Sequence, residues 1–322
     1  MISKRIGALF VALSLFLLCS CGAPPSADTG DESMQVVVTF DALYEIAAAV
    51  CGDGVTIIKI IPDGVEAHDF EPKPKDLTAL SSADILIVGG LGMEPWAERA
   101  VSAAGNEGLT VVDVSSGFEP ISLSADEHDE HSDHDHDDHD HDEHDHANDE
   151  HDHGEYDPHA WLSLKCAAAM ARSVRDALTT ADPAGADEYA QNCDAFTAQL
   201  DALYDEYSVK LGATSNKTIV TSHAVLAYLC RDFGLTQNSV SGVFAEGEPS
   251  AKQLAELVDF CRENGITTIL AESLASPQIS ETLAKNAGAT VKTIYTIEGA
   301  EDGMSYIERM SANLAVIYDS LK

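Results

Sequence analysis

The chain alternates short apolar runs with amphipathic stretches in both of its halves. Short runs rich in Val and Ile predict strands, and stretches with apolar residues every three or four positions predict helices between them. This alternation is typical of βα units stacked on mostly parallel sheets, so we predict an α/β protein with two lobes. The predicted strands are 35–39, 55–61, 84–88 and 110–114 in the first lobe and 217–221, 267–271 and 291–295 in the second. The predicted helices are 43–50, 74–81, 95–104, 225–233, 250–264, 276–287 and 303–321.

A longer amphipathic stretch lies between the two lobes. Its apolar residues recur at spacings of three and four: Tyr189, Cys193, Phe196, Leu200, Leu203, Tyr207 and Leu211. They predict one helix of about 23 residues, roughly 35 Å long, that runs along both lobes and couples them stiffly. An exposed coiled coil is disfavoured because the pattern lasts only about three heptads. We therefore expect an N-terminal lobe at 35–183, a linking helix at 184–212 and a C-terminal lobe at 213–322.

Length, composition and charge narrow the class of protein. A chain of 322 residues with 45% apolar residues can build a core in each of two domains. The formal net charge is -37, and only 18 residues are Lys or Arg. Nucleic acid is excluded as a partner because binding it needs a basic face. The negative net charge instead favours cations as ligands. We also expect a monomer.

The first residues resemble a bacterial lipoprotein signal. Lys4 and Arg5 precede an apolar run from Ile6 to Leu18, and Cys21 is the expected lipidated residue at the end of segment 1–21. A membrane-spanning helix is disfavoured, since this run is shorter than the roughly 20 residues that a bilayer needs. Segment 22–34 is small and polar, as in a tether. We expect a protein outside the cytoplasm, anchored by lipid to the bacterial cell membrane.

The remaining cysteines do not form a zinc motif. They are odd in number and contain no C-x-x-C pair: Cys51, Cys166, Cys193, Cys230 and Cys261. These spacings disfavour a zinc thiolate site and favour buried free thiols. One disulfide stays open as an alternative outside the cytoplasm, with no pairing that the sequence can identify.

A histidine-rich run, 126–153, interrupts the first lobe. It holds ten histidines and fifteen carboxylates with no Lys or Arg, so it cannot bury a core, and we expect a disordered, solvated loop. Imidazole binds Zn, Cu, Ni and Co, and the run is therefore expected to collect metal ions weakly. An acidic spacer without a metal role is the alternative, but acidity alone would not require so many histidines.

Only three histidines lie outside this run, and each is placed where a predicted strand has just ended. His68 follows the strand 55–61, His159 lies in YDPHAWLS, and His223 opens the predicted helix after KTIVTS. Ligands in open α/β sheets gather beyond the carboxyl ends of strands. The three imidazoles are therefore expected to converge in a cleft between the lobes.

Several segments resemble the metal-binding solute-binding lipoproteins of bacterial ABC importers, particularly the zinc-type branch. The matching segments include VVVTFDALYEIAAAV, GVEAHDFEPKPKD, DPHAWLS and TSHAVLAYL. The resemblance implies two lobes joined by a long helix, with His68, His159 and His223 as metal ligands in the interlobe cleft. It also implies a carboxylate from the loop TIYTIEGAEDG. Tyr295 stands where some relatives place Asp, which leaves Glu298 as the first choice and Glu272 as the runner-up, with water as a third option.

The expected function is capture of Zn²⁺ and its delivery to the permease and ATPase of an ABC importer, with the histidine-rich run as an accessory collector. Three imidazoles and one carboxylate favour tetrahedral zinc, whereas manganese prefers more oxygen ligands. A manganese or broad divalent-metal binding protein, or an adhesin, is the alternative. A zinc hydrolase is a further one, but the sequence contains no HExxH motif and no nucleophile elbow, so we expect no enzyme.

Overall fold

The first lobe is built on a four-stranded parallel sheet. The computed structural model describes residues 33–68, 70–123, 154–243, 249–274 and 276–322. Strands β1 (Met34–Val38), β2 (Val55–Lys59), β3 (Ile85–Val88) and β4 (Thr110–Asp113) lie in the order β2-β1-β3-β4. All four residues of β3 are buried, as expected for a strand covered on both faces.

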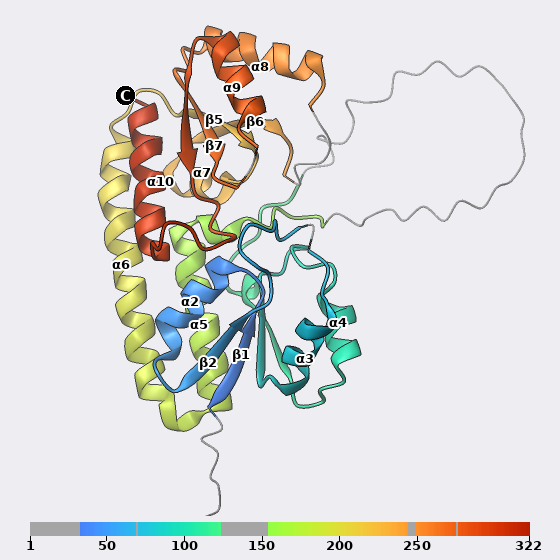
Figure 1. Cartoon of the computed structure of the whole chain (residues 1–322). Helices are drawn as coiled ribbons and strands as arrows, with labels where there is room; N and C mark the ends of the chain where they lie inside the picture. The colour runs from blue at the N-terminus through green and yellow to red at the C-terminus, as the bar shows by residue number, and fades with distance from the viewer. Residues whose placement is uncertain (1–32, 69, 124–153, 244–248, 275) are drawn as a thin grey trace, which may run out of the picture. The chain divides into compact units, whose positions relative to one another are not determined.

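Helices cover both faces of this sheet. Helix α2 (Asp41–Cys51) lies on one face, and α3 (Pro74–Ser82) and α4 (Ala97–Ala104) lie on the other (Figure 1). Right-handed β-α-β connections produce this arrangement. The chain moves across the sheet in one direction from β1 to β2 and in the opposite direction from β2 to β3 and β4, so the helices fall on opposite faces. The short 3-10 helices η1 (Val114–Gly117), η3 (Ala160–Leu162) and η4 (Pro183–Gly185) complete the connections.

The sequence did not predict helix α5 (Leu164–Ala181), which packs against α2 and the linking helix. Its buried face consists mostly of small residues, among them Ala167, Ala168 and Ala171. Alanine favours a helix strongly but gives a weak apolar pattern, so the periodicity of this stretch was easy to miss.

The second lobe repeats the parallel arrangement. Strands β5 (Thr218–His223), β6 (Thr236–Ser241), β7 (Thr268–Glu272) and β8 (Thr290–Ile294) lie in the order β6-β5-β7-β8. Its helices are α7 (Ala227–Phe233), α8 (Ala251–Glu263), α9 (Gln278–Ala287) and α10 (Tyr306–Ser320). Strand β6 was not predicted, because Val240 is the single buried residue in its sequence TQNSVS.

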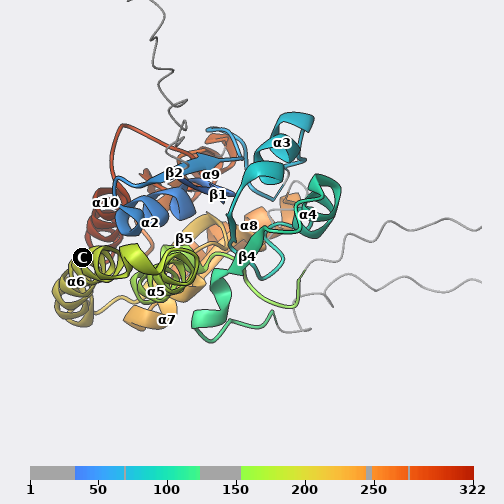
Figure 2. The ribbon, with the colours of Figure 1, turned by 90° about the horizontal axis from the view of Figure 1, so that it is seen from below.

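The linking helix α6 (Ala186–Gly212) is one continuous helix of 27 residues. It packs against α2 and α5 of the first lobe and against α10. Figures 1 and 2 both show α6 beside α5 and α10. The predicted fold of two mostly parallel sheets joined by a long helix is confirmed. A large apolar core joins α2, α5, α6 and α10, while a smaller cluster lies in the second lobe around Val220, Leu257 and Leu283.

Residues Met34–Lys322 form one compact unit. The predicted domain boundaries stay predictions. The predicted signal 1–21, nearly all of the tether 22–34 and the histidine-rich run 126–153 lie outside the described residues, although Met34 already belongs to β1. Among the described helices, none has both the length and the apolar character needed to cross a membrane.

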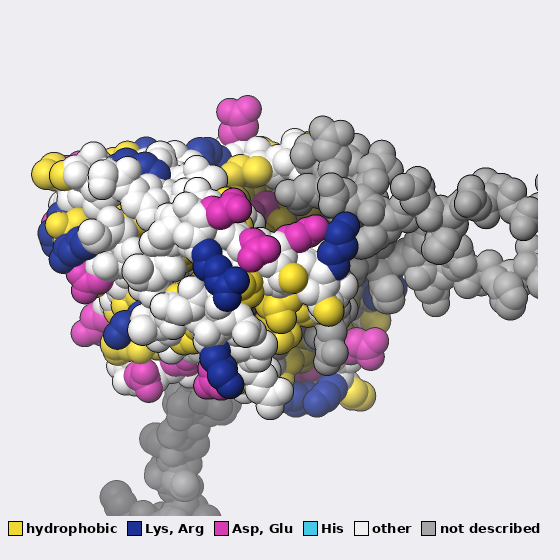
Figure 3. All heavy atoms as spheres, turned by 90° about the horizontal axis from the view of Figure 1, so that it is seen from above, with side chains coloured by type: hydrophobic (Ala, Val, Ile, Leu, Met, Phe, Trp, Pro, Cys, Tyr) yellow, Lys and Arg dark blue, Asp and Glu magenta, His cyan; other side chains and the backbone are white. Residues whose placement is uncertain are grey.

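Charged side chains of both signs share the face that Figure 3 shows. On the face that Figure 3 shows, Lys and Arg side chains are scattered among Asp and Glu rather than gathered in one patch.

The described cysteines are all free and buried, which agrees with the prediction of buried thiols. They are Cys51, Cys166, Cys193, Cys230 and Cys261.

Candidate metal centre

The three predicted histidines come from three separate segments. His68 lies in the loop between β2 and α3, and His159 directly precedes η3. His223 is the last residue of β5, so the prediction that it opens a helix was wrong: α7 begins only at Ala227. The prediction that a strand precedes each histidine was also wrong for His159, which among the described residues follows only the isolated bridge between Ser122 and Tyr156.

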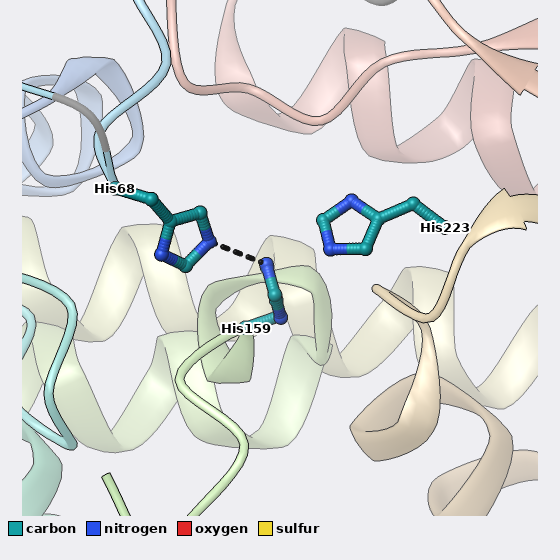
Figure 4. Close-up of side chains that lie close together, drawn as sticks. All are labelled: His68, His159 and His223. Atoms are coloured by element: carbon teal, nitrogen blue, oxygen red, sulfur yellow. Dashed lines mark hydrogen bonds between the residues drawn. The ribbon is translucent and has the colours of Figure 1, made fainter. Parts of the chain in front are cut away.

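These histidines meet in space. One ring nitrogen of each of His68, His159 and His223 lies within 4.8 Å of the others (Figure 4). The ring centroids are 5.2 Å apart for His68 and His159, 5.0 Å for His159 and His223, and 6.4 Å for His68 and His223. His159 and His223 are buried and His68 is half-buried. Three imidazoles at this separation can contact one cation together.

The closest pair of nitrogens matches the geometry of a tetrahedral ion. The Nε2 atoms of His68 and His159 are 3.2 Å apart and face each other. Two nitrogens bound to one zinc at 2.0–2.1 Å in a tetrahedron would be separated by about 3.3 Å. This edge of the site therefore needs little rearrangement to bind zinc.

Asp157 orients His159. Its Oδ1 lies 2.9 Å from Nδ1 of His159 and accepts the backbone N–H of the same residue at 2.8 Å. A carboxylate accepts hydrogen bonds, so the proton of the neutral ring lies on Nδ1 and the lone pair on Nε2. Asp157 is itself fixed, because its carbonyl accepts the Tyr228 hydroxyl at 2.6 Å and its N–H donates to Ile121.

Glu272 orients His223 in the same way. Its Oε2 lies 3.2 Å from Nδ1 of His223, and its Oε1 accepts the Ser222 hydroxyl at 2.8 Å. Burial disfavours charge on both groups, but their hydrogen bond and mutual attraction outweigh it. The pKa of His223 is consequently raised and the pKa of Glu272 lowered. Nε2 of His223 contacts the carbonyl of Val243, which an incoming ion would have to displace.

Glu298, predicted as the fourth ligand, lies beside this cluster. Among the described residues, the group of atoms within 4.8 Å contains the three histidines and no carboxylate. Glu298 is buried, and its Oε2 accepts the backbone N–H of Ala67, the residue before His68, at 3.0 Å. Burial raises the pKa of Glu298, and the nearby rings of His159 and His223 oppose the rise.

Trp161 supports the site through contacts that no sequence pattern indicates. The ring is fully buried 5.3 Å from His159, and its Nε1 donates to the carbonyl of Thr296 at 2.7 Å. The Tyr306 hydroxyl donates to the carbonyl of Trp161 at 2.5 Å. The hydrogen bond between Trp161 and Thr296 joins residues 135 positions apart, so no local sequence pattern could predict it.

The chain matches a known family over nearly its whole length. The family is described as the periplasmic component A of the zinc-uptake complex, and the match covers residues 36–320. The chain is 40% identical over 305 residues to a putative metal-binding protein of Treponema pallidum, covering 94% of this chain and 92% of that one. It is 31% identical over 327 residues to the high-affinity zinc uptake system protein ZnuA of Bacillus subtilis, covering 99% and 98% of the two chains.

A solved structure shows the same fold. The laminin-binding protein Lmb of Streptococcus agalactiae, described as bifunctional with adhesin and metal transporting activity, has a TM-score of 0.76 and 31% sequence identity. The similarity covers 90% of this chain and all of that one.

Proposed function

The chain belongs to the family of the periplasmic component A of zinc-uptake complexes, and we propose that it captures Zn²⁺ on His68, His159 and His223 for delivery to a membrane importer. It is a solute-binding protein of an uptake system and not an enzyme, and it works outside the cytoplasm. Zinc is its transported cargo. The alternative of a zinc hydrolase is thereby set aside.

The observation that supports this ligand set most directly is the convergence of three imidazoles that no local sequence motif holds together. Two of them have the second ring nitrogen engaged by a buried carboxylate, Asp157 or Glu272, as metal-binding histidines usually do. Nitrogen ligands in a compact group favour zinc over manganese, which prefers oxygen ligands in larger number.

Glu298 is our proposed fourth ligand. Its carboxylate is buried beside the histidines, and it can bind an ion through one oxygen while the other keeps the N–H of Ala67. Glu272 is the weaker choice because both of its oxygens already have partners, Ser222 and His223. Its role is to orient His223.

The remaining parts of the proposal concern the ends of the transport route. We expect lipidation of Cys21 to hold a monomeric carrier at the membrane, close to the permease of an ABC importer and its ATPase. The histidine-rich run 126–153 would raise the local concentration of zinc near the site. Its ten imidazoles supply the ligands, and its carboxylates attract cations.

The ligand set is tested by zinc titration against a competing chelator, with metal content measured in parallel. The parent is a chain lacking 126–153, which removes the run as a source of weak sites. We expect one tight zinc per protein. His68→Ala, His159→Ala and His223→Ala should each lose more than the roughly 10- to 100-fold that follows from loss of an outer partner.

Tyr295→Phe serves as the matched control, because Tyr295 lies in the same loop as Glu298 but its hydroxyl binds Asp302. Its zinc affinity should equal that of the parent. A tight zinc site that survives His223→Ala, or tighter binding of Mn²⁺ than of Zn²⁺, would contradict the proposal.

A further inference from the structure

We propose that Asp41, paired with Arg309, is a positioning residue for Glu298: the pair holds two successive backbone carbonyls, those of Glu298 and Gly299, and thereby holds the Glu298 carboxylate toward the ion. This inference rests on the proposed function, in which Glu298 is the fourth ligand. Asp41 would not touch the ion. It would act through the 296–300 segment, the short stretch between β8 and α10 that carries Glu298.

The 296–300 segment has a strained backbone. Ile297, directly before Glu298, has φ of 60°, although it is β-branched and fully buried. This region of backbone conformation is comfortable for glycine but unfavourable for isoleucine. Such a conformation persists only where the surrounding structure imposes it, and imposed strain is concentrated at functional sites.

Contacts from several other segments impose this conformation. They involve the backbone on either side of Ile297 and the Glu298 side chain. They are Trp161 Nε1 to the Thr296 carbonyl at 2.7 Å, Asp41 N to the Glu298 carbonyl at 3.1 Å, Ala67 N to Glu298 Oε2 at 3.0 Å, Arg309 to the Gly299 carbonyl at 2.8 Å and Ala300 N to Asp63 Oδ1 at 2.8 Å. Most of these partners belong to the first lobe, whereas Arg309 belongs to α10 of the second. The 296–300 segment is therefore held by contacts to both lobes.

Asp41 and Arg309 stand at the centre of these contacts. Oδ2 of Asp41 accepts a hydrogen bond from Arg309 at 2.7 Å, and Oδ1 accepts one from Lys59 at 2.5 Å. Arg309 is fully buried, and its other terminal nitrogen binds Gly299, the residue after Glu298. The ion pair thus joins the first residue of α2 to α10, and its two residues bind the successive carbonyls of Glu298 and Gly299.

Loss of the Asp41 carboxylate should release this hold. Arg309 would keep the Gly299 carbonyl but lose its short ion pair, and Ile297 could then relax toward negative φ. Relaxation at Ile297 would redirect the next side chain, Glu298. We therefore expect Asp41→Asn to resemble loss of the Glu298 carboxylate itself.

Co²⁺ bound in place of zinc provides the readout, because its visible absorption reports coordination number and geometry. Zinc affinity is measured alongside by chelator competition. We expect Glu298→Gln and Asp41→Asn to alter the Co²⁺ spectrum in the same way, and Asp41→Asn to weaken zinc binding about 10- to 100-fold, as loss of an outer partner does. In the Glu298→Gln background, Asp41→Asn should have no further effect on either measurement.

Gly299→Ala tests how the position of the 296–300 segment affects the site, without removing a buried charge. A Cβ at Gly299 would lie 3.1 Å from the backbone N of Gly64, so it should push the segment away from the loop that carries His68. Gly54→Ala is the matched control, since a Cβ at Gly54 meets nothing within 4 Å. Gly299→Ala should shift the Co²⁺ spectrum toward that of Glu298→Gln, and Gly54→Ala should not.

The outcomes separate the two proposals. If Glu298→Gln changes the spectrum but folded Asp41→Asn and Gly299→Ala do not, the positioning role is wrong and the ligand set stands. Equal effects of Asp41→Asn in the presence and absence of the Glu298 carboxylate would also overturn the positioning role. If Glu298→Gln leaves the spectrum unchanged, Glu298 is not a ligand and both ideas fail.

Discussion

At the scale of single residues, the candidate site depends on two carboxylates that orient the histidine rings through their Nδ1 atoms. Asp157 and Glu272 each engage the Nδ1 atom of a histidine, so the Nε2 atom is the one that a metal can use. Neither acid needs to touch the cation. Their burial makes the hydrogen bonds stronger than they would be in water, because competing solvent is excluded.

The convergence of the three histidines could be predicted from the sequence, but the arrangement of the carboxylates around them could not. His68, His159 and His223 are the only histidines outside the run, which made their convergence a specific expectation, although His223 ends β5 and only an isolated bridge precedes His159. Glu272 is the last residue of β7 and Glu298 follows β8, and no sequence pattern tells which one turns toward Nδ1 of His223. That choice depends on tertiary contacts such as the bond from Ala67.

Trp161→Phe should cost more stability than its size change explains. The substitution keeps most of the ring but removes the Nε1 donor from the carbonyl of Thr296. A buried carbonyl left without its partner costs about 1–3 kcal/mol. The free energy of unfolding, measured with urea, should fall by at least this amount.

Trp96→Phe is the matched control. Trp96 is also buried, but its Nε1 has no hydrogen-bond partner among the residues that the structure describes. Its substitution removes similar ring volume without breaking such a bond. Equal losses of stability in the two variants would show that the bond to Thr296 contributes nothing.

At the scale of elements, the helices and strands that could be predicted from the sequence are those with a strong apolar pattern. Helix α6 was predicted because large apolar residues mark one face through its whole length. The alanine-rich α5 and the polar strand β6 were missed, because tertiary packing rather than local pattern determines them. The ends of the other strands were predicted to within a few residues from their short apolar runs.

Glu94 ties two strand ends of the first sheet together. Its carboxylate accepts the Thr39 hydroxyl after β1 at 2.6 Å and the N–H groups of Gly89 and Gly90 after β3 at 2.9 and 3.1 Å. Burial raises the pKa of Glu94 to about 7, and these hydrogen bonds only partly oppose the rise. The folded protein therefore favours the neutral form of Glu94 more than the unfolded chain does.

The sign of the resulting pH dependence follows from this raised pKa. The contribution of Glu94 to stability is fully present below its unfolded pKa, near 4.5, and is lost as the pH rises through about 7. The total loss is about 3 kcal/mol, at about 1.4 kcal/mol for each pH unit. From pH 5 to pH 8, wild type should thus lose stability relative to Glu94→Gln, as measured by urea unfolding.

Glu98→Gln provides the control for removing one negative charge from the same region, because Glu98 is exposed on α4. Its stability relative to wild type should stay nearly constant over this pH range. A constant difference for Glu94→Gln as well would refute the assignment of a raised pKa to Glu94.

At the scale of the whole molecule, the two described segments that flank residues 124–153 pair with each other. Ser122 pairs with Tyr156 in an antiparallel bridge, and the N–H of Leu123 donates to the carbonyl of Glu155 at 2.9 Å. The pairing closes the fold on either side of residues 124–153 and leads directly into Asp157 and His159. The three candidate histidine ligands all lie outside the run.

Deletion of 126–153 should accordingly leave one tight zinc site and remove several weak ones. Calorimetric titration of the deletion variant and of the full chain should give the same tight affinity, with additional weak binding only in the full chain. Fold stability without metal should change little, because the paired ends are retained. Loss of the tight site on deletion would mean that the run itself supplies a ligand.

The buried cysteines have a practical consequence for following how this fold opens. Cys51, Cys166, Cys193, Cys230 and Cys261 each lie in a different helix, α2, α5, α6, α7 and α8 in that order. Burial raises the pKa of Cys51 and of Cys230 to about 12, and it also raises the pKa of the other three. Alkylating reagents attack the thiolate, so each thiol should react only when its own helix unfolds locally. The native chain thus carries a built-in set of chemical reporters, and mass spectrometry of the modified peptides can rank the order in which its helices detach.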